Sequence, residues 1–77
     1  IMEVVAMNHT PVSSSNLSSV GYDSARHILE VAFHNGAVYQ YFGVPDHIYQ
    51  GLMRAASHGQ YLDTFVKKAG YTYQRIR

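Results

Sequence analysis

The dipeptide Asn35-Gly36 constrains the fold of this chain more than any other feature of its sequence. It separates two short runs rich in β-favouring residues, and Asn-Gly readily adopts the positive φ angles of a type I′ turn. The twist of that turn matches two antiparallel strands. The sequence therefore predicts a β-hairpin over residues 27–42, closed by a two-residue loop.

A two-residue loop decides which side chains share a face of the hairpin. Three apolar residues of the first strand then share one face with their cross-strand partners: Leu29 with Phe42, Val31 with Gln40 and Phe33 with Val38. The opposite face carries the tyrosines of the second strand: Tyr39 with Ala32 and Tyr41 with Glu30, next to the pair of Ala37 with His34. We expect the apolar face to be covered by helices and the tyrosine face to be half-buried.

Two consecutive helices are predicted after the hairpin. Pro45 suits the first turn of a helix, because its missing N–H would have no partner there, so the first helix runs over residues 45–56. Ser57 begins a capping-box pattern and Gly70 is a natural stop, so the second helix runs over residues 57–69. Apolar residues recur every three or four positions in both, which indicates one buried face on each helix.

The remaining segments predict a small sheet around the hairpin. Residues 3–7 form a short apolar segment, residues 8–19 are mostly a loop, residues 17–22 form a short strand, and residues 71–77 form a final strand. We therefore expect an α+β fold: an antiparallel sheet of three to four strands, with both helices packed on the Leu29, Val31 and Phe33 face and the last strand at an edge.

Length and composition limit this fold to one small domain. The chain has 77 residues, 47% hydrophobic and 14% charged, which is too apolar for intrinsic disorder, and no apolar run reaches the ~18 residues of a membrane span. We expect a protein of the cytoplasm without a membrane segment. There is no cysteine, so no disulfide adds stability, and this favours a homodimer or other homo-oligomer.

Catalytic and metal-binding patterns are missing from the sequence. The five histidines include no His-x-x-x-His pair on a predicted helix, and the serines form no Gly-x-Ser-x-Gly motif. No Gly-rich phosphate loop is present either. We therefore predict no enzyme, no metal site and no cofactor.

Charge is distributed unevenly along the chain. The net charge is +1, but residues 1–50 carry −3 and residues 51–77 carry +4. Three cations of the second segment, Lys67, Lys68 and Arg75, are candidates for phosphate contacts, and the hydroxyl of Ser14 is a candidate donor to the same groups. The alternative is that these side chains are a solvated helix end and an ordinary loop.

Short landmarks follow one another along the chain in a characteristic order. They are Ser13-Ser14-Ser15-Asn16, Gly21-Tyr22-Asp23, Leu29-Glu30-Val31, Asn35-Gly36, Val38-Tyr39-Gln40-Tyr41, Gly43-Val44-Pro45, and Ser57 with Gly59 and Tyr61. Over about residues 12–75 the chain resembles the KTSC domain family, named for a tail of some lysyl-tRNA synthetases. The resemblance implies an RNA-binding module and brings no catalytic residues with it.

Tyr39 and Tyr41 are the central candidates for a binding site. They are two apart on one strand, so their rings lie on the same face at about 7 Å along the strand, a spacing suited to stacked bases. Glu30 and His34 on that face are candidates for hydrogen bonds to base edges or ribose. The alternative is that both tyrosines are core residues with their hydroxyls at the rim.

Three binding functions follow from these features. The leading hypothesis is a module for single-stranded RNA or an RNA end. The second is a small-nucleotide binding protein, because 77 residues provide little continuous groove. The third is a protein-interaction or assembly module that uses the same tyrosine face, since aromatic residues are also enriched at protein interfaces.

Overall fold

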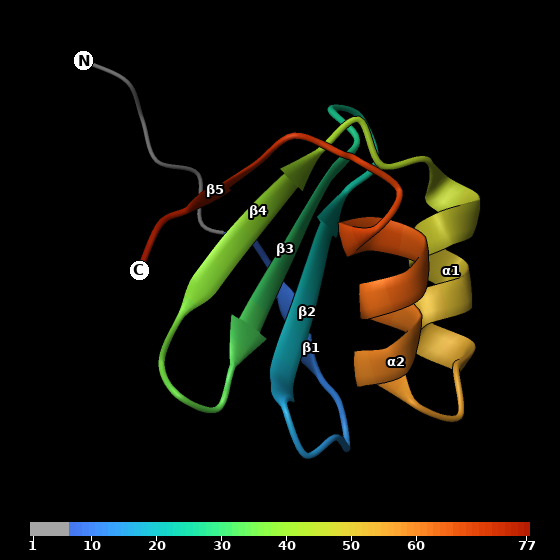
Figure 1. Cartoon of the computed structure of the whole chain (residues 1–77). Coiled ribbons are helices and arrows are strands. Elements are labelled where there is room, and N and C mark those ends of the chain that lie inside the picture. Colours follow the sequence, from blue (N-terminus) through green and yellow to red (C-terminus); the bar gives the residue numbers. More distant parts are fainter. Residues whose placement is uncertain (1–6) are drawn as a thin grey trace.

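The computed structural model describes residues 7–77 and has an α+β fold (Figure 1). The elements, in chain order, are β1 (His9–Pro11), β2 (Leu17–Asp23), β3 (Ile28–Phe33), β4 (Val38–Phe42), α1 (Asp46–Arg54), α2 (His58–Leu62), the π-helical turn η1 (Asp63–Lys67) and β5 (Tyr73–Arg75). Most of the predicted apolar segment 3–7 lies outside the described residues. Within residues 7–77, no helix is long and apolar enough to cross a membrane.

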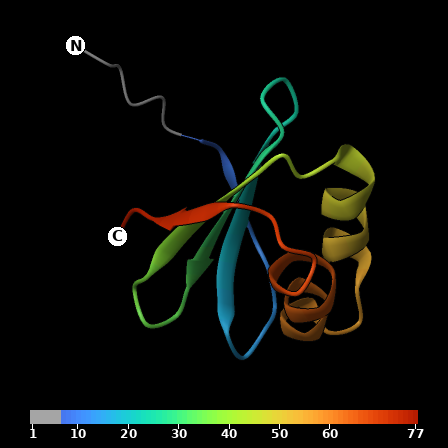
Figure 2. The same cartoon turned by 45° about the horizontal axis from the view of Figure 1, so that its top comes forward.

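The five strands form one antiparallel sheet in the order β1-β2-β3-β4-β5. Both helices lie on the same side of it, so the molecule has two layers (Figure 2). The core between the layers consists of side chains that are almost fully buried: Leu17, Val20, Leu29, Val31, Tyr41, Val44, Leu52, Leu62 and Val66. The predicted class is confirmed, and the helices cover the predicted face of Leu29, Val31 and Phe33. Five strands replace the three to four expected, and the β4 residues predicted for that face, Val38, Gln40 and Phe42, lie on the opposite one.

The hairpin turn differs from the prediction by one residue. Gly36 N donates to Phe33 O at 3.0 Å and Phe33 N donates to Ala37 O at 2.9 Å, so the loop has three residues. Gly36 has φ +91°, whereas Asn35 does not have a positive φ. This is a type I turn followed by a glycine bulge, the other common solution for a short hairpin. The predicted two-residue type I′ loop is therefore wrong.

The longer loop shifts the strand register by one residue. Leu29 pairs with Tyr41 and Val31 pairs with Tyr39, whereas Glu30 pairs with Gln40. A shift of one residue moves every side chain of a strand to the other face. Tyr39 and Tyr41 therefore share the helix-covered face with Leu29 and Val31, and the predicted tyrosine face with Glu30 and His34 is wrong.

Both predicted helices are present, but α1 begins one residue after Pro45 and ends at Arg54, two residues before the predicted end. Pro45 is the N-cap of α1, and the Ser57 hydroxyl accepts a hydrogen bond from Gln60 N at 3.2 Å, as its capping pattern predicts. The predicted second helix is present over α2 and η1. Its end is π-helical, with Lys68 N bonded to Asp63 O at 3.0 Å, and Gly70 follows with φ +86°.

Strand β1 was missed and falls in the predicted loop over residues 8–19. It has only three residues, and Pro11 cannot donate to a ladder. Such a residue is tolerated because β1 is an edge strand with a partner on one side only. The predicted C-terminal strand is confirmed as β5 at the opposite edge.

Gly51 on α1 is required by a close helix contact. A Cβ at this position would lie 2.1 Å from Tyr61 Oη and 2.7 Å from Tyr61 Cζ. We predict that Gly51→Ala lowers the free energy of unfolding by about 1 kcal/mol, because overpacking of ~1–3 kcal/mol exceeds the helix-propensity gain of ~1 kcal/mol. Urea denaturation measures the change.

Gly59→Ala is the matched control in α2. Its Cβ would lie 3.4 Å from Asn16 Nδ2, so we expect little change or a small gain in the free energy of unfolding. Equal stability of the two variants would contradict the contact between the helices.

Candidate functional site

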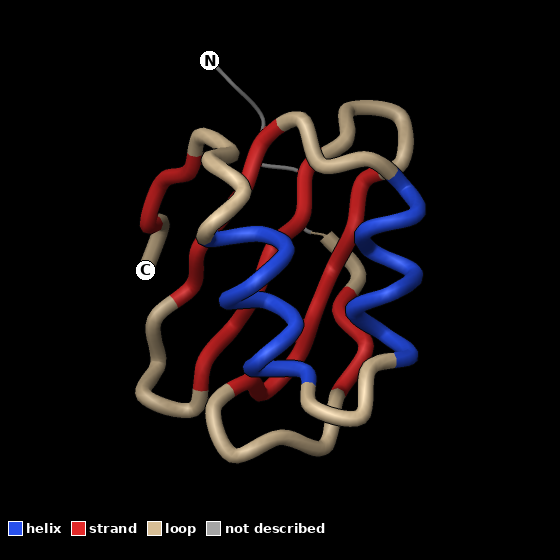
Figure 3. Tube along the Cα trace, turned by 45° about the vertical axis from the view of Figure 1, so that its right-hand side comes forward, coloured by secondary structure: helices blue, strands red, loops and turns tan. Residues whose placement is uncertain are grey.

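A groove lined by aromatic and basic residues lies beside β4 and β5 on the helix-covered face. Its volume is about 470 Å³, and it is lined by Phe33, Asn35, Ala37, Tyr39, Tyr41, Lys67, Tyr73 and Arg75. In Figure 3 both helices lie in front of the sheet, and β5, beside the C-terminus, lies to one side of them. The groove therefore lies where the helix layer ends before the sheet does. We call it the aromatic groove.

The tyrosines of the aromatic groove form a contact cluster. Ring centroids are 6.4 Å apart for Tyr39 and Tyr41, 6.1 Å for Tyr39 and Tyr73, and 5.8 Å for Tyr41 and Tyr73. The three rings share a face because Tyr73 pairs with Tyr41 across β4 and β5. Phe33 meets Tyr39 edge-on, with centroids 5.8 Å apart and planes at 89°.

Burial divides the tyrosines into a floor and a rim. Tyr41 is only 3% exposed, whereas Tyr73 is 64% exposed and Tyr39 is half-buried. Burial, the largest cause, together with the nearby Tyr39 and Tyr73 hydroxyls raises the pKa of Tyr41 to about 12. Tyr41 is therefore neutral under ordinary conditions, and Tyr39 and Tyr73 are the rings that a ligand can reach.

Two cations flank the rings. Lys67 Nζ lies 5.5 Å from the centroid of Phe33, within cation–π distance. Arg75 pairs directly with Tyr39 across the β4–β5 ladder, and its Nε donates to the backbone oxygen of Arg77 at 2.9 Å. A guanidinium has two further nitrogens that suit phosphate oxygens. Among the described residues, no carboxylate lines the groove, so its charge is positive.

The structure brings half of the predicted site residues together. Tyr39, Tyr41, Lys67 and Arg75 line the aromatic groove. Tyr73 and Asn35 also line the groove and were not predicted, and Phe33 was predicted only for the core. The place of Tyr73 could have been predicted from the sequence. Tyr73 and Arg75 are two residues apart on a predicted strand, so their side chains share one face.

The other predicted site residues lie elsewhere. His34 Nε2 donates to the backbone oxygen of Ser14 at 2.9 Å, and the Ser14 hydroxyl accepts from Leu17 N at 3.2 Å, so both stabilise a loop. Lys68 Nζ lies 3.4 Å from Asp63 Oδ2. Glu30 lies on the opposite face of the sheet.

Ser14 also lines a second, polar cavity. This cavity has a volume of about 530 Å³ and lies between the serine-rich loop and the start of α2; it is lined by Ser13, Ser14, Ser15, Asn16, Ala56, Ser57, His58, Gly59, Gln60 and Asp63. It contains no lysine or arginine, so phosphate groups have no counter-charge there.

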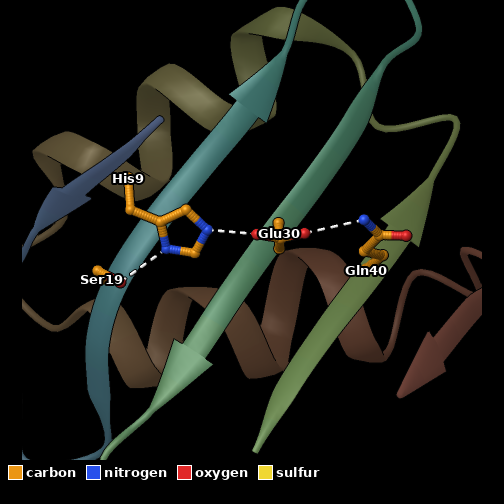
Figure 4. A network of polar contacts seen from close by, with 4 residues as sticks. All are labelled: His9, Ser19, Glu30 and Gln40. Carbon is orange, nitrogen blue, oxygen red and sulfur yellow. Dashed lines mark hydrogen bonds and ion pairs between the residues drawn. The ribbon is translucent and has the colours of Figure 1, made fainter. Parts of the chain in front are cut away.

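The face away from the helices carries a row of polar side chains across all five strands. Their contacts run from Ser19 through His9 to Glu30, and from there through Gln40 to Gln74. Figure 4 shows the first four, with the helices behind the sheet. His9 Nδ1 lies 2.7 Å from Ser19 Oγ, His9 Nε2 contacts Glu30 Oε2, and Gln40 Nε2 donates to Glu30 Oε1 at 2.8 Å.

Serine, histidine and glutamate are the residue types of a nucleophilic triad, and in this row they lie on three neighbouring strands. His9, Ser19 and Glu30 line neither the aromatic groove nor the polar cavity. The row holds the short edge strand β1 to β2 and β3. Between residues 7 and 77, no three His, Cys, Asp or Glu side chains are arranged to hold a metal ion.

Gly21 has no side chain, and this leaves room for the His9 ring to contact Glu30. It pairs with both residues, and a Cβ at this position would lie 2.8 Å from His9 Cδ2 and 3.0 Å from the Asn8 carbonyl oxygen. We predict that Gly21→Ala displaces His9 and lowers the free energy of unfolding by about 1 kcal/mol, the net contribution of one such hydrogen bond. Urea denaturation and amide exchange in β1 measure the effect.

A double-mutant cycle with His9→Ala is the control for this prediction. If Gly21→Ala acts through His9, the double variant is less destabilised than the sum of the single variants. Strict additivity of the two changes would contradict the role of Gly21.

Comparisons with known proteins agree with this fold. The sequence model of the KTSC domain family matches residues 13–73 of the chain. A KTSC domain protein from Yersinia pestis has a crystal structure with a TM-score of 0.83 and 41% identity, covering 94% of this chain and 100% of that one. A protein of Stutzerimonas stutzeri is 41% identical over 70 residues, which is 91% of this chain and 99% of its own.

The lysine–tRNA ligase of Trichormus variabilis is also similar, at 34% identity over 76 residues. The match covers 99% of this chain but 13% of the ligase. The similar segment is therefore a small part of that enzyme.

Proposed function

The chain belongs to the KTSC domain family, and from that premise we propose that it is a non-enzymatic binding module for single-stranded RNA or an RNA end. The aromatic groove is the observation that carries the proposal. It places the half-buried Tyr39 and the exposed Tyr73 beside two cations, and no carboxylate of the described residues lines it. Unpaired bases stack on such rings while cations hold the adjoining phosphates.

The ligase relatives add support from a different direction. A segment similar to this chain occurs within lysine–tRNA ligases of Nostoc punctiforme and Trichormus variabilis, where it makes up 12% and 13% of the chain. By name these enzymes act on a tRNA. A single-stranded RNA ligand is consistent with that setting.

The affinity for RNA is expected to depend on salt through the two groove cations. If Lys67 and Arg75 each neutralise one phosphate, about 0.7 counterion is released per contact, and affinity falls about sevenfold between about 50 and 200 mM salt. Fluorescence anisotropy of a labelled oligoribonucleotide measures this change. Substituting both cations with alanine should weaken binding and remove most of the dependence.

Lys68→Ala is the matched control, because Lys68 is adjacent in sequence but paired with Asp63 and outside the groove. It should leave the salt dependence unchanged. Undetectable binding at both salt concentrations would contradict the RNA proposal. The protein-interaction hypothesis would then remain, and binding through an apolar interface would depend little on salt.

The predicted homodimer and cytoplasmic location are part of the same proposal. A chain of 77 residues without a disulfide gains core area from a second copy. Sedimentation equilibrium of the full chain tests the dimer, and a single species at monomer mass would exclude it.

A further inference from the structure

We infer that the aromatic groove receives one nucleotide at a time: a single base with its adjoining phosphates, at a strand end or flipped out of a stack. This inference rests on the proposed function and specifies its ligand. It follows from the contacts among the rings, from their exposure and from the positions of the two cations.

The tyrosine rings leave no space between them for a base. Their centroid distances of 5.8–6.4 Å lie within the range of ~4.5–7 Å for rings in direct contact. Intercalation of a base between Tyr39 and Tyr41, or between either ring and Tyr73, would require the rings to separate. A ligand base must therefore stack on the outside of the cluster.

The outside of the tyrosine cluster offers one stacking site for a base rather than a row of sites along a strand. Tyr41 is 3% exposed and forms the floor, so its ring faces are covered. Tyr39 and Tyr73 lie on neighbouring strands, touch each other and are tilted by 43°. Because the two rings touch at this tilt, a flat base can stack on only one of them at a time.

Phe33 closes one side of the Tyr39 ring, and a cation lies on each side of that ring. Phe33 stands perpendicular to Tyr39 with Lys67 over its ring, and the hairpin loop adds Asn35 to the same end. Arg75 lies across the ladder on the other side of Tyr39. One base on Tyr39 thus has a cation toward each of its two phosphates.

The size of the groove agrees with a single unit. About 470 Å³ falls toward the small end of the ~300–1,000 Å³ typical of small-molecule sites. The Asn35 side-chain oxygen already accepts from Ala37 N at 3.0 Å, so its amide nitrogen is the group left to face a ligand. The Asn35 amide and the two cations therefore add donors beside the aromatic rings, which suits an anionic nucleotide.

A length series of ligands tests the inference. Calorimetry with the full chain compares uridine 3′,5′-bisphosphate with oligouridylates of two, four and six nucleotides. We expect the affinity of the bisphosphate to lie within about fivefold of the affinity of the hexamer. A longer strand only offers more nucleotides that can occupy the same site and adds weak contacts outside it. Gln40→Ala, on the opposite face of β4, should give the same series.

A different length dependence overturns the inference. If each added nucleotide contributed a stacked base, affinity would rise roughly 5- to 150-fold per nucleotide. The single-nucleotide site would then be wrong, while the proposed RNA binding would stand. If no ligand of the series bound, the proposed function and this inference would both fall.

Discussion

Replacing Tyr39 with alanine is expected to weaken binding of single-stranded RNA by roughly 5- to 150-fold, or about 1–3 kcal/mol, the contribution of one base stacked on an aromatic ring. Tyr39 is the ring that adjoins both cations, because Arg75 pairs with it and Lys67 lies over the neighbouring Phe33. Anisotropy titration of a labelled oligoribonucleotide measures the loss.

Two variants separate stacking from a general loss of structure. Tyr39→Phe keeps the ring and should bind within about threefold of the original chain. Gln40→Ala alters the next residue on the opposite face and should have no effect. If Tyr39→Ala remained folded by circular dichroism and bound RNA with full affinity, the aromatic groove would not be the RNA site.

Stability is expected to fall at alkaline pH through Tyr41. The pKa of its hydroxyl is raised to about 12 in the folded chain, from the ordinary tyrosine value of 10.0, chiefly because the side chain is buried. The unfolded chain therefore releases this proton first. The contribution of Tyr41 to stability is fully present below pH ~10 and is lost as pH rises toward 12, by about 2–3 kcal/mol at ~1.4 kcal/mol per pKa unit.

Tyr41→Phe removes this titration while keeping the ring. Urea denaturation at several pH values should show a smaller decline for the variant than for the original chain. Titration of lysines and of the tyrosines outside the aromatic groove affects both proteins alike, so it cancels in the comparison. A parallel decline of the two proteins would show that Tyr41 is not buried in its neutral form.

Local signals predicted most of the elements. Ser57 and Pro45 mark helix starts through their own backbone chemistry, and Asn35-Gly36 marks a turn for the same reason, so each could be read without knowing the rest of the fold. The loop length could not be read in this way. Gly36 accepts a positive φ in either loop, and only the final pairing decides between two residues and three.

Part of the site could be predicted because residues two apart on one strand share a face even when the hairpin register is wrong by one residue. Tyr39 and Tyr41 remain on one face whichever way the strand turns, since strand side chains alternate. Which face they occupy depends on the loop, and so Glu30 was placed beside them when it lies opposite. The contact of His9 with Glu30 joins residues 21 apart in sequence and depends on the unpredicted strand β1.

We propose that the aromatic groove, rather than the open face of the sheet, binds single-stranded RNA. Two-dimensional NMR of the isotope-labelled chain, titrated with a short oligoribonucleotide, distinguishes the two faces. We predict that the resonances of Tyr39, Tyr73 and Arg75 shift while those of Ser19 and Glu30 on the opposite face stay in place. Shifts confined to the Ser19 and Glu30 face, or no shifts at all, would contradict it.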